Sequence, residues 1–254
     1  MEELIEYQQF AKQLCHLSGE VIKKYFREQI SVDQKIDNSP VTIADRKAEE
    51  IMREAILKEF PDDGILGEEF GVHQGKSQYK WILDPIDGTK SFICGAISFG
   101  TLIALTKNDN PVLGVFHQPI LNELLYGDNK NTVLNEQKVL VRECESISNA
   151  VLLTTDHLNI EKYQNAKRFD SLIRQVKLYR GWGDCYGYYL LSTGFVDIMV
   201  DPIMSYWDIA ALVPIVKGAG GIITDFHGND PLKGNSAVAS SAKIHAQVIQ
   251  ELNS

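Results

Sequence analysis

Two carboxylates that could share a metal ion lie in the segment Trp81–Phe92, whose sequence is WILDPIDGTKSF. The apolar run Trp81–Leu83 predicts a short buried strand that ends at Asp84. Pro85 fixes one backbone angle, so we expect the chain to turn there and to direct Asp84 and Asp87 toward one point. Carboxylate oxygens are ligands that Mg²⁺ prefers, usually together with waters and phosphate oxygens of a substrate. The segment therefore predicts a magnesium site.

The residues that follow could bind phosphate. Gly88 allows the backbone to pass close to a ligand, and the amides of Gly88, Thr89 and Lys90 could open a helix N-terminus that faces an anion. Metal-binding carboxylates joined directly to such a turn suggest phosphoester chemistry. Asp-Pro and Asp-Gly are also common turn dipeptides, so a solvated loop without a metal is the alternative.

The composition narrows the class of protein. With 254 residues, 44% hydrophobic content and 23% charged content, the chain fits one large globular domain or two packed halves. Its apolar runs are far too short to span a membrane, and the start Met1–Glu6 has no basic segment typical of a signal peptide. The net charge of −9 disfavours nucleic-acid binding. The scattered cysteines Cys15, Cys94, Cys144 and Cys185 contain no CxxC pair, which favours reduced thiols in a cytoplasmic protein and argues against structural zinc.

Apolar periodicity predicts the elements that must position these residues. Helices are expected over residues 4–26 and 42–60, and strands over 99–106, 111–117 and 123–126. After about residue 145 the elements alternate, with strands over 150–155, 196–200 and 221–224 and helices over 161–174, 186–192, 208–217 and 242–252. We predict two tightly joined halves in a sandwich of alternating helix and sheet layers. The α+β half (1–145) holds the metal motif, and the α/β half (146–254) completes the site.

Three further acids lie at the ends of predicted elements. Glu68 follows a short apolar run and is either a metal ligand or part of a solvated acidic loop. Asp45 stands three residues after Thr42, which is a capping-box spacing and equally allows a structural role. Asp208 begins a helix, where an acid is favourable without any metal. Because element ends bring side chains from distant segments together, we expect these acids to converge on the two aspartates described above.

The order of these motifs resembles the inositol monophosphatase superfamily of metal-dependent phosphatases. The resemblance rests on Trp81–Phe92, on Gly67-Glu68-Glu69 upstream and on Trp207–Ala211 downstream, and it extends from Ser39 to Gly221. Within the superfamily the chain is most similar to the histidinol-phosphatase branch, through residues 91–95, 99–105, 114–119, 183–186 and 194–197. The resemblance implies a layered fold of the sugar-phosphatase type, a small phosphorylated metabolite as substrate, and a homodimer.

The same resemblance implies metal ligands. Glu68 and Asp84, with the backbone carbonyl of Ile86, would hold one Mg²⁺. Asp84, Asp87 and Asp208 would hold a second ion, so that Asp84 bridges the two. Two to three Mg²⁺ per site are implied in all.

It also implies which residues surround the reacting atoms. Glu68, Asp45 and Thr89 would lie around the nucleophilic water and a third Mg²⁺, and the amides of Gly88 and Thr89 would bind phosphate oxygens. The transition state of phosphoryl transfer asks mainly for positioning and charge stabilisation, so no phosphoenzyme and no histidine base are required. His117, at the end of a predicted strand, is the histidine whose position in the structure would test this expectation.

The leaving group is expected to contact residues further along the chain. By resemblance Asp184 and Asp201, together with Asp87, would contact it, and Arg180 could line the same pocket or pair with a nearby acid. Local alternatives are a helix N-cap for Asp184 and a turn acid for Asp201. Histidinol carries an ammonium group and an imidazole, which suit carboxylates, whereas inositol is neutral.

These expectations lead to one principal function and two alternatives. The principal function is Mg²⁺-dependent hydrolysis of L-histidinol phosphate. The first alternative is the same chemistry on inositol 1-phosphate, a sugar phosphate or a 3'-phosphonucleotide. The second is a non-catalytic interaction protein on a phosphatase scaffold, which is disfavoured because every metal carboxylate of the pattern is present.

Overall fold

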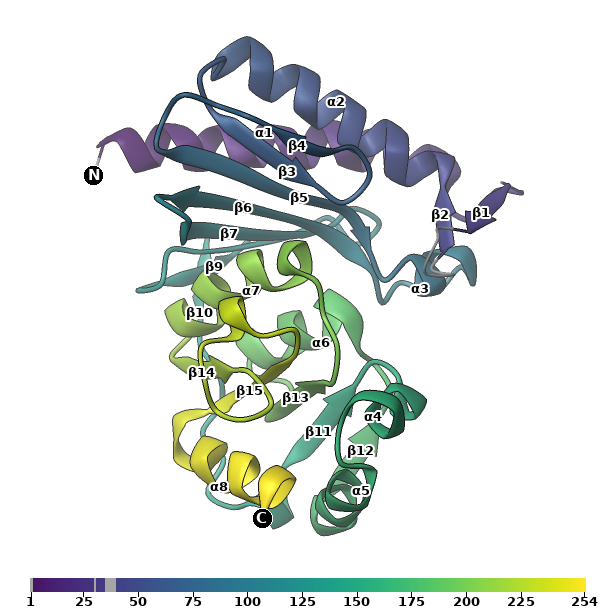
Figure 1. The fold of residues 1–254 in the computed structure, drawn as a ribbon, viewed down its shortest axis with the longest axis vertical. Helices are drawn as coiled ribbons and strands as arrows, with labels where there is room; N and C mark the ends of the chain where they lie inside the picture. Colours follow the sequence, from purple (N-terminus) through teal and green to yellow (C-terminus); the bar gives the residue numbers. More distant parts are fainter. Residues whose placement is uncertain (1, 30, 35–39) are drawn as a thin grey trace.

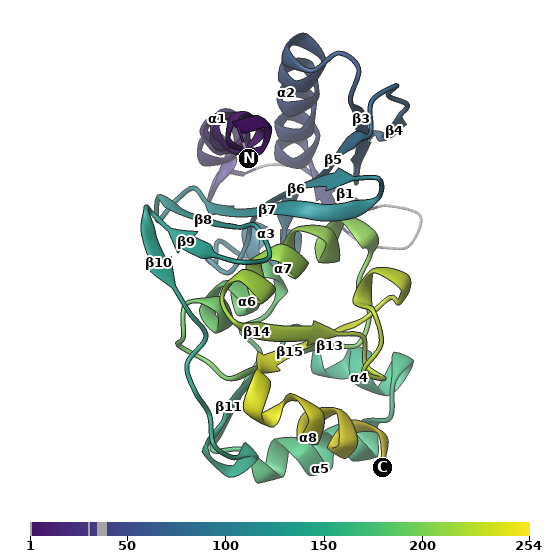
Figure 2. The ribbon, with the colours of Figure 1, turned by 90° about the vertical axis from the view of Figure 1, so that its left-hand side faces the viewer.

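The computed structural model describes residues 2–29, 31–34 and 40–254, so Ser39, where the family resemblance begins, lies outside the described part. Along the long axis of the molecule the described elements stack as helix, sheet, helix, sheet and helix (Figures 1 and 2). The predicted sandwich of alternating helix and sheet layers is confirmed.

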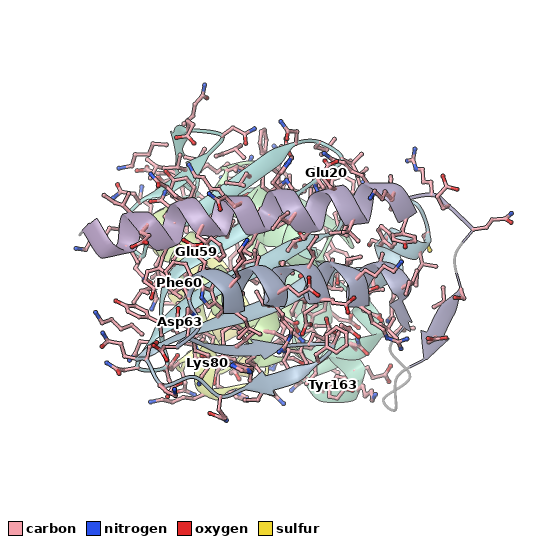
Figure 3. All side chains as sticks on the ribbon, turned by 90° about the horizontal axis from the view of Figure 1, so that it is seen from above. Glu20, Glu59, Phe60, Asp63, Lys80 and Tyr163 are labelled. Carbon is pink, nitrogen blue, oxygen red and sulfur yellow. The ribbon has the colours of Figure 1, made fainter. Side chains whose placement is uncertain are left out.

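The outermost helix layer consists of α1 (Glu2–Tyr25) and α2 (Ile43–Glu59), which run side by side across the larger sheet (Figure 3). The paired strands β1 (Val32–Gln34) and β2 (Pro40–Thr42) precede α2. The apolar faces of both helices pack on the sheet in one core cluster, because helical spacing places their apolar residues on one side. This cluster includes Tyr7, Leu14, Met52, Ile56 and Trp81.

Eight of the described strands form the larger sheet, in the order β10-β9-β8-β7-β6-β5-β3-β4. Their bounds are β3 (Gly64–Gly67), β4 (Gly71–His73), β5 (Tyr79–Asp87), β6 (Gly100–Lys107), β7 (Asn110–Gln118), β8 (Glu123–Gly127), β9 (Thr132–Leu134) and β10 (Gln137–Val139). β3 and β5 are parallel neighbours, whereas the other described neighbours are antiparallel. The carboxyl ends of β3 and β5 therefore lie at the same edge of the sheet.

The remaining layers belong to the C-terminal part of the chain. The helices α6 (Asp184–Ser192) and α7 (Tyr206–Gly218) lie between the sheets, as Figure 2 shows. The second sheet has the order β12-β11-β13-β15-β14, with bounds β11 (Val151–Thr154), β12 (Leu178–Arg180), β13 (Ile198–Asp201), β14 (Gly221–Thr224) and β15 (Ala237–Ser241). The last helix layer contains α4 (His157–Tyr163), α5 (Ala166–Gln175) and α8 (Ala242–Asn253). The short elements are α3 (Thr89–Ile93), η1 (Ile147–Asn149) and η2 (Pro231–Lys233).

Helix α7 lies directly on the backbone of the larger sheet. A Cβ atom at Gly114 in β7 would lie 2.0 Å from the carbonyl oxygen of Ala211 in α7, so no larger residue fits there without moving the helix. The distance between α7 and the sheet is therefore fixed by backbone contact. The division at residues 145 and 146 stays a prediction, because α7 comes from the second predicted half and packs on the sheet of the first.

Some predicted elements differ from the structure. The single helix predicted over 161–174 is wrong: the chain forms α4 and α5, and the Asn165 side chain caps α5 by accepting a hydrogen bond from the Arg168 amide (3.3 Å). The strand predicted over 196–200 begins two residues later, at Ile198. No helix in the described part of the chain is long and apolar enough to cross a bilayer.

Candidate active site

A β-bulge in β5 places the carboxylates of Asp84 and Asp87 together. Asp84 pairs with Leu102 and Asp87 with Gly100, so one extra residue of β5 is accommodated between these pairs. In a regular strand side chains three residues apart face opposite sides, and the bulge cancels that alternation. The prediction that the strand ends at Asp84 and turns at Pro85 is wrong, because β5 continues to Asp87 through the bulge.

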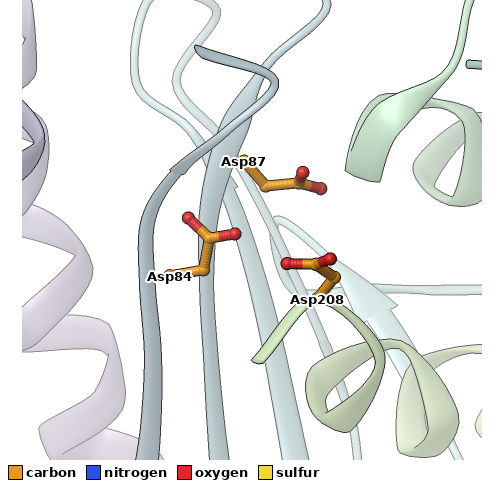
Figure 4. A group of neighbouring side chains, drawn as sticks. All are labelled: Asp84, Asp87 and Asp208. Carbon is orange, nitrogen blue, oxygen red and sulfur yellow. The ribbon is translucent and has the colours of Figure 1, made fainter. Parts of the chain in front are cut away.

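Helix α7 brings a third carboxylate to the same place. Asp208 lies in the first turn of α7, and one of its oxygens accepts a hydrogen bond from the Ser205 amide (2.7 Å). Asp84, Asp87 and Asp208 each offer an oxygen, and these three atoms lie within 4.8 Å of one another (Figure 4). Asp208 thus caps its helix and also lies in the cluster, and its role as a metal ligand stays a prediction.

The carboxylates of this cluster are buried and repel one another. Oδ1 of Asp84 is buried and has no hydrogen-bond partner among the described residues. Burial, followed by the charges of Glu68, Asp87 and Asp208, raises the pKa of Asp84 well above its usual range. Burial also raises the pKa of Asp87 well above its usual range, and it raises that of Asp208 to about 7. Buried, mutually repelling carboxylate oxygens of this kind fit a hard divalent cation such as Mg²⁺.

Glu68 and Asp45 approach the cluster from neighbouring elements. Glu68 directly follows β3, and its amide donates to the Leu83 carbonyl of β5 (3.1 Å). The pKa of buried Asp45 is raised by burial above all and also by the charge of Glu68, which indicates that the two carboxylates are close. Oδ2 of Asp45 accepts from the amide and the hydroxyl of Thr42, at 2.9 and 2.6 Å. The predicted capping box is therefore present.

The other oxygen of Asp45 faces Thr89. The Thr89 hydroxyl lies 3.4 Å from Oδ1 of Asp45 and donates to the Ile86 carbonyl at 3.0 Å. Gly88, with a φ of 88°, is the N-cap of α3, so a helix begins where the sequence predicts it. The structure thus brings Asp45, Ile86, Gly88 and Thr89 to the edge of the carboxylate cluster.

A cavity of about 70 Å³ opens beside the cluster. It is lined by Asp87, Thr155, Asp156, Asn159, Asp184, Asp201, Pro202, Ile203, Met204 and Asp208. The acids predicted to contact the leaving group, Asp184 and Asp201, both line it. Burial above all raises the pKa of Asp184 to about 7 and that of Asp201 to about 6.

The structure does not support the local alternatives for Asp184 and Asp201, and it places Arg180 outside the lining of the cavity. The N-cap of α6 is Gly183, and Asp184 is the first helical residue, with a φ of 51°. Asp201 ends β13, and its Oδ1 accepts from the Thr155 amide (3.1 Å), so it is a buried strand residue rather than a turn acid. Arg180 is exposed, donates to the Tyr179 carbonyl (2.7 Å) and is not among the residues that line the cavity.

Asp156 and Asn159 are among the cavity residues that the sequence does not predict. Asp156 caps α4 by accepting from the Leu158 amide (3.0 Å), and Asn159 lies in the first turn of that helix. The strands β11 and β13 are parallel, so Asp156 and Asp201 follow or end neighbouring strands at the same edge. Recognising Thr155-Asp156 as the end of a parallel strand would have identified Asp156.

Together the layered fold and the buried carboxylate cluster define a metal-dependent phosphomonoesterase. The model of the inositol monophosphatase family matches residues 3–254, and the chain belongs to this family.

Individual relatives share this family and differ in their described activities. The chain is 42% identical to the chloroplastic bifunctional phosphatase IMPL2 of Arabidopsis thaliana, over 98% of this chain and 76% of that protein. It is 39% identical to a histidinol-phosphatase of Chlorobaculum parvum, over 92% of this chain and 91% of that protein. The solved structure of an inositol monophosphatase from Zymomonas mobilis is 37% identical and superposes with a TM-score of 0.86, covering 97% of each chain.

Proposed function

We propose that this protein hydrolyses L-histidinol phosphate to L-histidinol and phosphate. The observation that carries the proposal is the acidic lining of the cavity, where Asp156, Asp184 and Asp201 add carboxylates beyond those of the metal cluster. A leaving group that carries an ammonium group gains charge-assisted hydrogen bonds from such a lining, whereas a neutral polyol gains less. The identity to a described histidinol-phosphatase supports the same choice.

Mg²⁺ is the cofactor that the cluster suits, with two to three ions per site. Glu68, Asp84, Asp87 and Asp208, with the carbonyl of Ile86, would hold these ions. When bound, Mg²⁺ supplies positive charge that stabilises phosphoryl oxygens and lowers the pKa of water.

The remaining residues bind phosphate and handle the proton of the attacking water. The amides of Gly88 and Thr89 bind phosphate oxygens, as the N-terminus of α3 favours negative charge. The Thr89 hydroxyl and the Asp45 carboxylate form a pair that orients the water and accepts its proton as the new bond to phosphorus forms. Asp184 and Asp201, with Asp87, hold the leaving group. As its bond to phosphorus breaks, the leaving oxygen keeps the electron pair and takes up a proton from a solvent water.

The family and the relatives also support a second candidate. Inositol 1-phosphate is favoured by the likeness to an inositol monophosphatase, and sugar phosphates and 3'-phosphonucleotides use the same chemistry. Formation of a homodimer and localisation in the cytoplasm stay predictions, and one relative is described as chloroplastic.

Phosphate release from this panel of esters, with Mg²⁺ and with EDTA, tests the proposal. We expect kcat/KM to be highest for L-histidinol phosphate and activity to vanish in EDTA. Asp84→Asn should abolish turnover without changing the circular dichroism spectrum. A higher kcat/KM for any neutral ester would refute the substrate, and an active Asp84→Asn variant would refute the metal site.

Asp201→Asn separates the two candidates. The asparagine oxygen can still accept from the Thr155 amide, so the fold should persist while the negative charge is lost. At pH 8 we expect a loss of roughly 10- to 100-fold in kcat/KM for L-histidinol phosphate, because hydrogen bonds to charged groups contribute about 1.5–3 kcal/mol. The value for inositol 1-phosphate should change little. Glu161→Gln, at an exposed position of α4, is the matched control.

A further inference from the structure

A fully buried carboxylate outside the carboxylate cluster holds the turn that carries Glu68. Glu49 lies in α2 and is 0% exposed. Its oxygens accept hydrogen bonds from the Glu69 amide (2.8 Å) and the Phe70 amide (3.1 Å), and Nε of Arg53 donates to it at 2.7 Å. Both amides belong to the turn between β3 and β4, directly after Glu68.

These contacts fix Glu68 from both sides. Its own amide is bonded to the Leu83 carbonyl of β5, and the next two amides are bonded to Glu49. Arg53 also donates to the Gly71 carbonyl at the far end of the turn. On the near side Gly67 packs against the carboxylate, because a Cβ atom there would lie 2.0 Å from Oε1 of Glu49. The turn is therefore held by β5 at Glu68 and by α2 at the residues that follow.

An ion pair whose carboxylate is fully buried calls for an explanation other than stability. Burying a carboxylate is costly, and well-packed apolar residues often give equal or greater stability. Glu49 lies four residues after Asp45, so both project from the same face of α2. One helix face thus carries Asp45 and the group that holds Glu68. The spacing of Asp45 and Glu68 is in this way set by one rigid element.

We propose that Glu49 is a positioning residue that holds Glu68 for metal binding, an inference that rests on the proposed function. Arg53 completes the arrangement by pairing with the Glu49 carboxylate. Residues that orient metal ligands typically change metal affinity or activity 10- to 100-fold when they are replaced.

Glu49→Gln tests this role. A glutamine offers one oxygen, so either the Glu69 or the Phe70 amide would face an NH₂ group and lose its acceptor. We expect the Mg²⁺ concentration for half-maximal activity to rise roughly 10- to 100-fold, with a KM for the ester at saturating Mg²⁺ within about threefold of wild type, since Glu49 lies outside the cavity lining. Calorimetric titration of Mg²⁺ in the absence of ester should show the same loss of affinity. Glu50→Gln, at the exposed neighbouring position, is the matched control.

Gly67→Ala perturbs the same contact from the opposite side and provides a second test if Glu49→Gln does not fold. It removes no polar group, yet its Cβ atom must displace the Glu49 carboxylate, so Mg²⁺ affinity should fall as well. Unchanged Mg²⁺ affinity in either folded variant, with only a lower melting temperature, would overturn the inference and leave Glu49 a structural residue. If wild type binds Mg²⁺ and Glu49→Gln binds it weakly but neither hydrolyses any ester, the positioning role stands and the proposed function fails.

Discussion

Removing one charge from the carboxylate cluster should stabilise the metal-free protein. In Asp208→Asn the amide oxygen can still accept from the Ser205 amide, so the cap of α7 is retained. What is lost is a negative charge within 4.8 Å of oxygens of Asp84 and Asp87. At that distance one ionised neighbour costs about 3.5 kcal/mol if the effective dielectric constant is about 20.

The pKa of Asp208 gives a similar magnitude and sets the pH range. Its pKa is raised from 3.8 to about 7, so the folded state holds this proton more tightly than the unfolded state. The resulting cost is absent below pH 3.8, grows as the pH rises toward 7 and is constant above 7. The shift corresponds to about 4 kcal/mol above pH 7. Because an amide is also partly desolvated in this site, we expect Asp208→Asn to gain about 2–4 kcal/mol at pH 8 and little at pH 4.

Thermal unfolding in EDTA and in Mg²⁺ measures both effects. For a chain of this length the gain corresponds to a rise in Tm of roughly 5–15 °C in EDTA at pH 8. Added Mg²⁺ should raise the Tm of wild type, because a ligand at about 100 times its Kd contributes about 2.7 kcal/mol, whereas Asp208→Asn should respond weakly. Asp62→Asn, an exposed acid, is the control. A metal-free Asp208→Asn that is no more stable than wild type at pH 8 would refute this electrostatic reasoning.

Three other perturbations have defined outcomes. Asp197→Ala removes the carboxylate that accepts two hydrogen bonds from Arg142 and should cost about 2–3 kcal/mol in urea unfolding; a loss below about 0.5 kcal/mol would contradict a structural role for the pair. The pKa of buried His117 is lowered to about 4, chiefly by burial, so its neutral form is favoured in the fold; stability is undiminished above pH 6.5 and falls by about 3 kcal/mol toward pH 4. His117→Gln should flatten that acid limb of the stability curve, and an unchanged limb would exclude His117 as its source. Gly114→Ala must push α7 away from the sheet at Ala211, so we expect a loss of about 1–3 kcal/mol and weaker Mg²⁺ binding by calorimetry; normal affinity would show that the helix position does not matter.

The sequence predicts the local part of the site better than its long-range part. Asp84 and Asp87 are close in the chain, and Asp208 is marked by its place at a helix start, so short patterns identify them. Such patterns do not predict the bulge, because it depends on the register of β5 against β6. Asp156 is not predicted for a related reason: its place in the cavity depends on the parallel pairing of β11 with β13.

The fold, like the site, is predicted where it depends on local patterns and not where it depends on long-range pairing. The alternation of helices and strands predicts the layers, because each layer must bury an apolar face. Strand β15 is composed of small residues over 237–241 and has no strong β-branched pattern, yet it lies between β13 and β14 in the second sheet. The break between α4 and α5 depends on the side chain of Asn165, which apolar periodicity does not predict.

The bulge in β5 has a consequence for length variation within this segment. It makes the number of residues between Asp84 and Asp87 matter more than their identity. Substitutions at Pro85 or Ile86 change only local packing, but a one-residue insertion there would reverse the face of the strand on which Asp87 lies relative to Asp84. The carboxylate of Asp87 would then point away from that of Asp84. We therefore expect insertions and deletions to be excluded from this short stretch, even where its residue types are free to change.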